Sequence, residues 1–223
     1  MDKVLLGRIQ EALPDEPGIS GKEEYINCAV LVLLMYMDGE YHFVFEKRAE
    51  NIRQAGEICF PGGKYDPKQD AGFRETALRE TTEELGVDAG KLRIIGRLDT
   101  VVAPMGTTAD AFLGVIDVQS LDELQISRGE VAKVFTVPVS FFEQNDPGAY
   151  KVNVTAHPTY IDEKGEEVVS FPAKELGLPK RYTSAWPIAP YNIYAYEVAG
   201  ETIWGMTARL VRSVIARIQA LNH

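Results

Sequence analysis

Arg79-Glu80-Thr81-Thr82-Glu83-Glu84-Leu85-Gly86-Val87 is the stretch of this 223-residue sequence that decides the fold. Its pattern is helical, and Gly86 stands where a left-handed residue would close a helix. Residues three and four apart share a helix face, so Glu80, Glu83 and Glu84 are predicted to project to one side. Because like charges repel, this face predicts a bound cation, and oxygen ligands of this kind favour Mg²⁺ or Mn²⁺.

A glycine loop precedes the helix. Glu57-Ile58-Cys59-Phe60 predicts a short strand that ends at Pro61-Gly62-Gly63, and the helical pattern begins at Ala71. Two glycines permit the positive φ angles of a tight loop. Backbone N–H groups in such a loop and at a helix N-terminus favour phosphate. Gly62 and Gly63 are therefore predicted to bind substrate.

Arg79 has a predicted structural role. It lies one helical turn after Glu75 and one turn before Glu83, so its guanidinium can orient carboxylates on either side without binding the metal. An acidic helix by itself is commonly only a solvated face. The glycine loop beside it favours a functional site instead.

These residues together resemble the Nudix box, written as Gly, five residues, Glu, seven residues, then Arg-Glu-U-x-Glu-Glu-x-Gly-U with U aliphatic. The second half matches except at Thr81, which occupies an aliphatic position. In the first half, Gly63 lies 16 positions before Arg79 instead of 14, and Ala71 replaces the first Glu. Either Asp66 or Asp70 could supply the missing carboxylate, and the sequence leaves that choice open.

The resemblance implies a fold and a reaction. The fold is α/β, a Nudix-type α/β/α sandwich with a mixed β-sheet between helices. The reaction is hydrolysis of a nucleoside diphosphate linked to another moiety, with water attacking phosphorus while metal ions neutralise charge. The metal ligands are Glu80, Glu83 and Glu84. The proton of the water passes either to Glu80 or to Glu130, which precedes a strand predicted at 131–137.

A narrower resemblance concerns the substrate. Arg48, Arg53, Gly56 and the Phe60-Pro61-Gly62-Gly63 run are similar to the signature of the coenzyme A pyrophosphatase branch, as are Lys64-Tyr65-Asp66-Pro67 and Ile203-Trp204-Gly205-Met206-Thr207-Ala208-Arg209. The segment departs from the signature by lacking its serine and by having two residues between Arg53 and Gly56 instead of three.

This resemblance implies cleavage of coenzyme A or acyl-CoA to 3′,5′-ADP and 4′-phosphopantetheine. Arg48, Arg53 and Lys64 are then expected to bind phosphate, which suits Arg and Lys side chains. Two alternatives stay open: a Nudix pyrophosphatase acting on ADP-ribose or another nucleotide, and a non-catalytic Nudix-fold module that senses a nucleotide. Sensing modules tend to lose the helix carboxylates, and all three are present here.

Composition excludes several partners. A formal net charge of −10 disfavours long nucleic acid. The longest apolar run, Ile26 to Met37, is shorter than the roughly 18 residues of a membrane-spanning helix. The N-terminus lacks a secretory pattern, so we expect a cytoplasmic protein with a small-molecule nucleotide substrate. Cys28 and Cys59 are expected to be reduced core residues. A homodimer is compatible with the family.

Organisation along the chain predicts one domain over residues 1–223, with an insertion at about 145–190 that is rich in proline, glycine and charge. The other predicted elements are a helix at 4–12, strands at 26–37, 41–46, 92–102, 111–118 and 131–137, a short helix at 138–142, hairpins across 162–165 and over Gly200, and a last helix bearing the stripe Leu210, Val211, Val214, Ile215 and Ile218.

Overall fold

The computed structural model describes residues 3–15 and 18–221. Its helices are α1 (Lys3–Ala12), α2 (Phe73–Leu85), α3 (Val139–Gln144) and α4 (Gly205–Leu221). Its strands are β1 (Ile26–Met37), β2 (Glu40–Arg48), β3 (Ile58–Cys59), β4 (Gly62–Lys64), β5 (Leu92–Arg97), β6 (Val101–Ala103), β7 (Thr107–Ile116), β8 (Val131–Pro138), β9 (Gly148–Val152), β10 (Thr155–Ala156), β11 (Thr159–Ile161), β12 (Glu167–Val169), β13 (Trp186–Pro187), β14 (Tyr191–Val198) and β15 (Glu201–Trp204).

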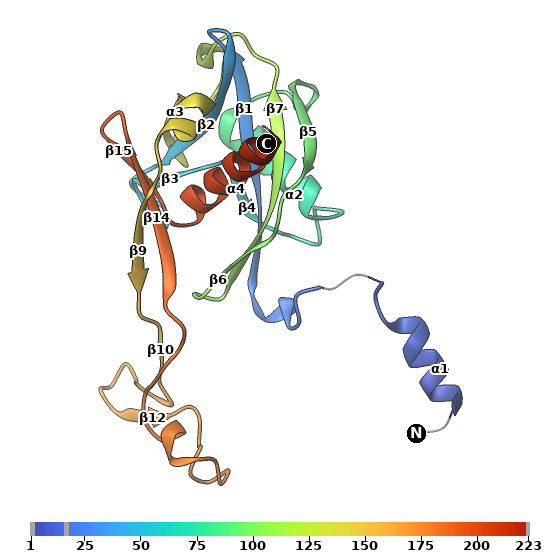
Figure 1. The fold of residues 1–223 in the computed structure, drawn as a ribbon, viewed down its shortest axis with the longest axis vertical. Coiled ribbons are helices and arrows are strands. Elements are labelled where there is room, and N and C mark those ends of the chain that lie inside the picture. The colour runs from blue at the N-terminus through green and yellow to red at the C-terminus, as the bar shows by residue number, and fades with distance from the viewer. Residues whose placement is uncertain (1–2, 16–17, 222–223) are drawn as a thin grey trace.

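The main sheet is mixed. Its strands follow the order β3-β2-β1-β7-β5, with β4 also paired to β1, β6 to β7 and β8 to β2. The strands β1 and β7 run parallel from the pair Ile26 and Thr107 to the pair Met35 and Ile116, whereas the other pairs in this sheet are antiparallel. The predicted mixed sheet between helices is therefore confirmed, with α2 and α4 on opposite sides of β1 (Figure 1).

Strand β1 explains why the apolar run is buried on both faces. Alternate side chains of a strand point to opposite faces. Leu31 and Leu33 pack in one cluster with Leu85 of α2. Val32 packs in the other cluster with Val211 of α4. A strand covered by helices on both sides reads as a continuous apolar run, as this one does.

Helix α2 ends as its sequence predicts. Gly86 has φ 61°, and its N–H donates to the carbonyl of Thr82 at 3.0 Å. A Cβ atom at Gly86 would lie 2.1 Å from the carbonyl oxygen of Gln125, so a side chain would also clash. Thr81 is fully buried, and its hydroxyl donates to the carbonyl of Ala77 at 2.7 Å. That bond satisfies the hydroxyl and lets threonine stand at a position where the family has an aliphatic residue.

Two predicted elements differ from the structure. Residues 92–102 form two strands, β5 and β6, which are separated by residues 98–100 and both pair antiparallel with β7. The expected glycine loop is the short strand β4, in which Gly62 pairs with Val30 of β1. Gly62 alone of the two glycines has a positive φ, at 156°. A Cβ atom there would lie 2.3 Å from the carbonyl oxygen of Ala29, so this pairing requires glycine.

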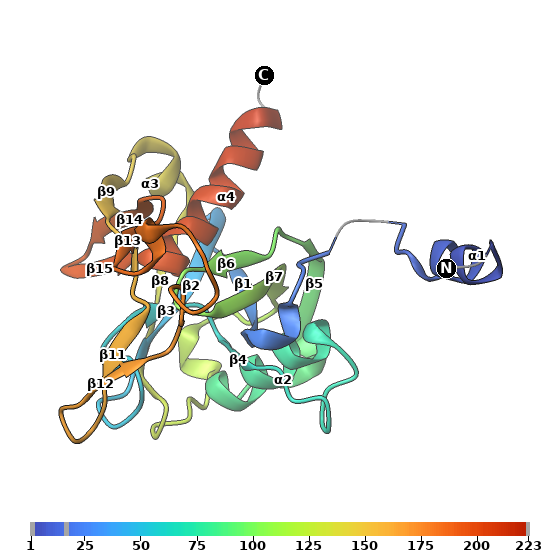
Figure 2. The ribbon, with the colours of Figure 1, turned by 90° about the horizontal axis from the view of Figure 1, so that it is seen from below.

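The segment at 145–190 extends away from the main sheet (Figure 1). It contains the small antiparallel pairs β10–β13 and β11–β12. Strand β9 pairs with β14, so the chain leaves and re-enters the body of the molecule at neighbouring positions, Val152 and Tyr191. Helix α1 also stands apart from the sheet (Figure 2). Among the described helices, none has the length and apolar character needed to span a membrane.

Candidate metal centre

The acidic helix and the glycine strand lie directly against each other. Glu84 is 4% exposed, and its Oε2 accepts a hydrogen bond from the Gly62 N–H at 2.9 Å. A Cβ atom on Gly63 would lie 2.3 Å from the carboxyl carbon of Glu80. Gly62 therefore orients a carboxylate of α2 with its N–H, and Gly63 leaves room for the Glu80 side chain. The expected phosphate contact of the Gly62 N–H is already taken by Glu84.

Arg79 pairs with three carboxylates at the acidic helix. Its Nε and Nη2 donate to the two oxygens of Asp70 at 2.8 and 3.0 Å. It also forms ion pairs with Glu80 at 2.9 Å and with Glu83 at 3.0 Å. Glu75 instead faces Arg74, at 3.6 Å. Arg79 thus orients carboxylates from both sides, but the N-terminal partner is Asp70 and not Glu75.

Asp70, and not Asp66, is the loop acid that contacts Arg79. Asp70 is 5% exposed and also accepts from the Thr76 hydroxyl at 2.9 Å. The hydrogen bonds from Arg79 hold the pKa of this carboxyl well below its usual range. Asp66 binds Gln69 at 2.8 Å in its own turn. The two extra residues between the glycines and α2 are accommodated by that turn, which brings Asp70 to the arginine.

The three helix carboxylates have unequal environments. The Glu83 side chain is 55% exposed, that of Glu80 is 19% exposed, and Glu84 is buried. Burial raises the pKa of Glu80. Burial, and then the charge of Glu46, raise the pKa of Glu84 to about 9. Among the described residues, no group of three His, Cys, Asp or Glu side chains converges closely enough to hold a metal.

Glu46 is a site residue that the sequence did not reveal. It lies on β2 opposite Cys59 of β3 and is 0% exposed. The Cys59 thiol donates to its Oε1 at 3.2 Å, whereas its Oε2 is buried without a hydrogen-bond partner. Burial raises the pKa of Glu46 to about 7. Its position was readable in principle, because Glu46 follows Val44 on the strand face that packs against α2.

The donor set around α2 suits a divalent cation. Carboxylate oxygens are the ligands that Mg²⁺ and Mn²⁺ prefer, and an orphaned buried carboxylate oxygen is costly unless a cation compensates it. The acids of α2 supply the carboxylate oxygens, and Oε2 of Glu46 is the orphaned buried oxygen.

The predicted phosphate-binding residues differ in their burial. Arg48 is half-buried, and its Nε donates to the backbone carbonyl of Arg53 at 3.0 Å. The Arg48 charge lowers the pKa values of Glu46 and Glu84 against their burial, which places it near both. Arg53 and Lys64 are exposed.

Glu130 lies next to the same segment. Its backbone carbonyl accepts from the N–H of Ala49, and its side chain is exposed. Its charge is among the causes that raise the pKa values of Glu46 and Glu80. The structure therefore brings Glu130 into electrostatic reach of the acidic helix.

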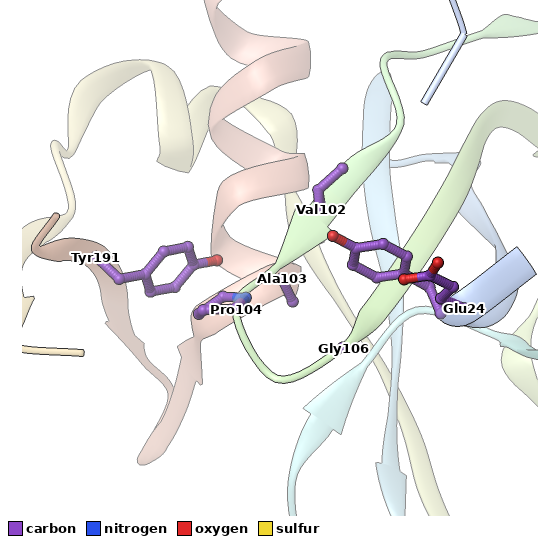
Figure 3. Close-up of a pocket in the computed structure, with 7 residues that line it drawn as sticks. Glu24, Val102, Ala103, Pro104, Gly106 and Tyr191 are labelled. Carbon is purple, nitrogen blue, oxygen red and sulfur yellow. The ribbon is translucent and has the colours of Figure 1, made fainter. Parts of the chain in front are cut away.

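Two surface cavities differ in their relation to the predicted site residues. One of about 720 Å³ is lined by the β2–β3 connection and the β14–β15 hairpin, including Lys47, Gly56, Glu57, Glu201 and Trp204. The other, of about 380 Å³, lies between the β6–β7 turn and Tyr191 and is lined by none of the predicted site residues (Figure 3). The larger cavity shares the chain segment that carries Arg48 and Arg53.

Comparison with known proteins decides the family. The model of the NUDIX domain matches residues 27–157, which include α2, β4 and Glu130. The chain belongs to the Nudix family. This confirms the resemblance of the Arg79–Val87 stretch to the Nudix box.

The Nudix relatives of this chain include a coenzyme A diphosphatase. Nudix hydrolase 3 of Caenorhabditis elegans is 39% identical over 124 residues, covering 54% of this chain and 51% of that protein. The peroxisomal coenzyme A diphosphatase NUDT7 of Mus musculus is 34% identical over 115 residues, covering 51% and 48%. The uncharacterized Nudix hydrolase NudL of Photorhabdus laumondii is 24% identical over 216 residues, covering 96% of both. The chain spans about half the length of the first two of these relatives.

Two solved structures of Nudix proteins are also similar. A C. elegans Ap4A hydrolase is 21% identical, with a TM-score of 0.42 over 51% of this chain and 80% of that chain. The NUDIX domain of Shewanella oneidensis NrtR, complexed with ADP ribose, is 19% identical, with a TM-score of 0.43 over 65% and 88%. Nudix hydrolases generally need divalent cations and act on small nucleotide substrates.

Proposed function

We propose that this protein is a divalent-metal-dependent pyrophosphohydrolase that cleaves coenzyme A or acyl-CoA to 3′,5′-ADP and a 4′-phosphopantetheine product. The observation that carries the proposal is the contact of the buried carboxylate of Glu84 with the Gly62 N–H, beside Glu80 and Gly63. Through this contact, the acidic helix α2 lies against strand β4, whose glycines let the two elements approach closely. We propose that the clustered acids of α2 bind a cation. The relatives named as coenzyme A diphosphatases support the substrate.

In this proposal Mg²⁺ or Mn²⁺ is held by Glu80, Glu83 and Glu84. The bound cation supplies charge neutralisation on the diphosphate and activation of water. Arg79 holds Glu80 and Glu83 in reach of each other, and Asp70 fixes Arg79. Gly62 orients Glu84. The chain's own contribution is thus mainly positioning and electrostatics, which dominate phosphoryl chemistry.

We propose Glu130 as the acceptor of the water's proton. Glu80 is engaged by Arg79 and assigned to the metal, whereas Glu130 is exposed and near enough for its charge to act on Glu80. A general base needs a free carboxylate within reach of the water. If a Glu130→Gln variant kept the acidic limb of the pH–rate profile, the base would be Glu80 instead.

Arg48, Arg53 and Lys64 are proposed to bind the phosphates of the substrate. The charge of Arg48 acts on Glu46 and Glu84, Lys64 directly follows Gly63, and all three residues are positively charged in an otherwise acidic chain. The cavity of about 720 Å³ next to the Arg48–Arg53 segment is large enough for part of a coenzyme A molecule. We further propose that the protein acts in the cytoplasm, whereas one relative is named as peroxisomal and another as mitochondrial. We also propose that it forms a homodimer.

A substrate panel tests the proposal. The full chain is incubated with Mg²⁺ or Mn²⁺ and with coenzyme A, acetyl-CoA, ADP-ribose, a dinucleoside polyphosphate or an oxidised nucleoside triphosphate, and products are separated by chromatography. We expect 3′,5′-ADP from the coenzyme A compounds at the highest kcat/KM. Much faster turnover of ADP-ribose would refute the substrate and leave the reaction class standing. Binding without turnover across the whole panel would favour the nucleotide-sensing module.

A further inference from the structure

Glu46 is a buried acid without a counter-charge. No part of its side chain is exposed, and within the described part of the chain its side chain accepts a hydrogen bond from the Cys59 thiol, to Oε1 at 3.2 Å. Oε2 is buried and has no partner within the described part of the chain. A thiol is a weak donor. The carboxylate therefore lacks the compensation that buried charges in proteins normally have.

The surroundings of Glu46 make its burial less favourable still. Its charge is the largest influence after burial that raises the pKa of Glu84 to about 9. The charges of Glu130 and Glu80 in turn raise the pKa of Glu46. The positive charge of Arg48 opposes this effect on Glu46. Several carboxylates thus gather near the buried edge of α2, where the guanidinium of Arg79 pairs with Glu80 and that of Arg48 acts on Glu46.

Glu46 and Glu84 are also held from the same short segment. Cys59 donates to Glu46, and Gly62, three residues further on, donates to Glu84. Both acids come from opposite sides of that segment, one from β2 and one from α2. Each carboxylate is buried and accepts one hydrogen bond from this segment. A bound cation is the compensation that carboxylate oxygens of this kind favour.

We propose that Glu46 is a fourth carboxylate of the divalent-metal centre, presenting its orphaned Oε2 to the cation beside Glu84. This inference rests on the metal-dependent function proposed above. It adds a ligand from strand β2, outside the acidic helix. It also accounts for a charged residue at a strand position that packs against α2, where Val44 precedes it as a core residue.

The test is direct titration of Mn²⁺ into the metal-free full chain, with free Mn²⁺ followed by electron paramagnetic resonance. Glu46→Gln keeps the size of the side chain and removes its charge. We expect Mn²⁺ affinity to fall on the order of 10–100-fold. We also expect the rise in Tm on adding Mn²⁺ to shrink, because binding to the native state alone sets that rise.

Glu197→Gln is the matched control. Glu197 is an exposed glutamate on β14, paired with Thr202 of β15, and it belongs to neither the acidic helix nor β2. This variant should bind Mn²⁺ as tightly as the wild type. An equal loss of affinity in Glu46→Gln and Glu197→Gln would overturn the proposal, because it would reflect net charge and not a ligand.

The stability of the metal-free variant separates a ligand from a structural acid. Removing an uncompensated buried charge should leave Glu46→Gln at least as stable as the wild type without metal. Wild-type Mn²⁺ affinity in a folded Glu46→Gln would refute the ligand role. If Glu46→Gln fails to fold, the same titration is carried out on Glu46→Asp, which keeps the charge on a shorter side chain. Weakened Mn²⁺ binding in Glu46→Asp would support the proposal, and unchanged binding would refute it. Absence of Mn²⁺ binding in the wild type would refute the proposed function itself.

Discussion

Asp70 orients the charged side chains of the acidic helix through its contact with Arg79. Asp70 receives two hydrogen bonds from the guanidinium and one from Thr76, and it is almost completely buried. Arg79 in turn contacts Glu80 and Glu83. Substitution of Asp70 should therefore change the positions of the proposed metal ligands, because it releases Arg79. Asp70 itself touches neither substrate nor metal in the proposed mechanism.

We expect Asp70→Asn to destabilise the protein by about 1.5–3 kcal/mol, the contribution of hydrogen bonds to charged groups. Because folding lowers the pKa of Asp70, its stabilisation is present above the unfolded value of about 3.9 and is lost as the pH falls toward the folded value. Urea unfolding of the wild type should thus lose stability below about pH 4 more steeply than the variant. Asp66→Asn, in the exposed turn, should change stability far less. Equal effects of both substitutions would contradict the assignment of Asp70.

The helix acids make a second prediction at this scale. Glu83→Gln and Glu84→Gln should each lower kcat at saturating metal at least about 100-fold, since changes beyond the ligands already cost 10–100-fold. Glutamine at position 84 keeps an oxygen for the Gly62 N–H, so the fold should survive, as circular dichroism would show. Glu75→Gln, on the same helix but outside the Arg79 contacts, is the control. Wild-type turnover in either variant would remove that residue from the metal centre.

At the scale of elements, strand β4 joins the acidic helix to the sheet through two adjacent glycines with different tasks. Gly62 approaches the backbone of β1, where a Cβ atom would lie 2.3 Å from the Ala29 carbonyl oxygen at φ 156°. Gly63 has no positive φ, and its Cβ atom would meet only the flexible end of Glu80. One glycine is therefore required by the backbone and the other by the site.

Alanine at each glycine separates these tasks. Gly62→Ala should destabilise the fold by roughly 2–5 kcal/mol, from backbone strain and overpacking together. Gly63→Ala should leave the Tm nearly unchanged but lower kcat/KM and metal affinity, because Glu80 must move. Thermal unfolding and Mn²⁺ titration of both variants measure the two effects. A large Tm loss in Gly63→Ala with normal metal affinity would contradict this division.

For the whole molecule, we propose one domain over residues 1–223 with the segment at about 145–190 as an insertion. Neither hydrophobic cluster of the main sheet contains a residue from 145–190. Val152 and Tyr191 pair across β9 and β14, so the two ends of residues 153–190 are adjacent. Short loops close such ends at little entropic cost.

Replacing residues 153–190 with an Asn-Gly turn should therefore leave a folded protein with normal Mn²⁺ affinity. The turn suits a two-residue hairpin between antiparallel strands. We expect cooperative unfolding near the wild-type Tm and a changed KM for coenzyme A only if this segment covers the substrate. Substitution of 153–154 alone by the same two residues is the control for the new sequence. Loss of cooperative unfolding in the shortened chain would show that the segment belongs to the core.

The sequence by itself determined the elements that depend on local pattern. The apolar run of β1, the α2 helix with Gly86 at its end, the hairpin over Gly200 and the stripe of α4 all follow from periodicity and from the backbone freedom of glycine. The acids of α2 and their family were also readable, because their spacing lies within one helix.

Only the tertiary structure decided which distant groups meet. The choice of Asp70 over Asp66 depends on how the turn before α2 closes, and β4 exists because Gly62 can approach β1. Glu46 looked like one more residue of a strand until the packing of β2 against α2 buried it near Glu84. Contacts between segments far apart in the chain are set by packing across the sheet, so the spacing of residues within one segment does not predict them.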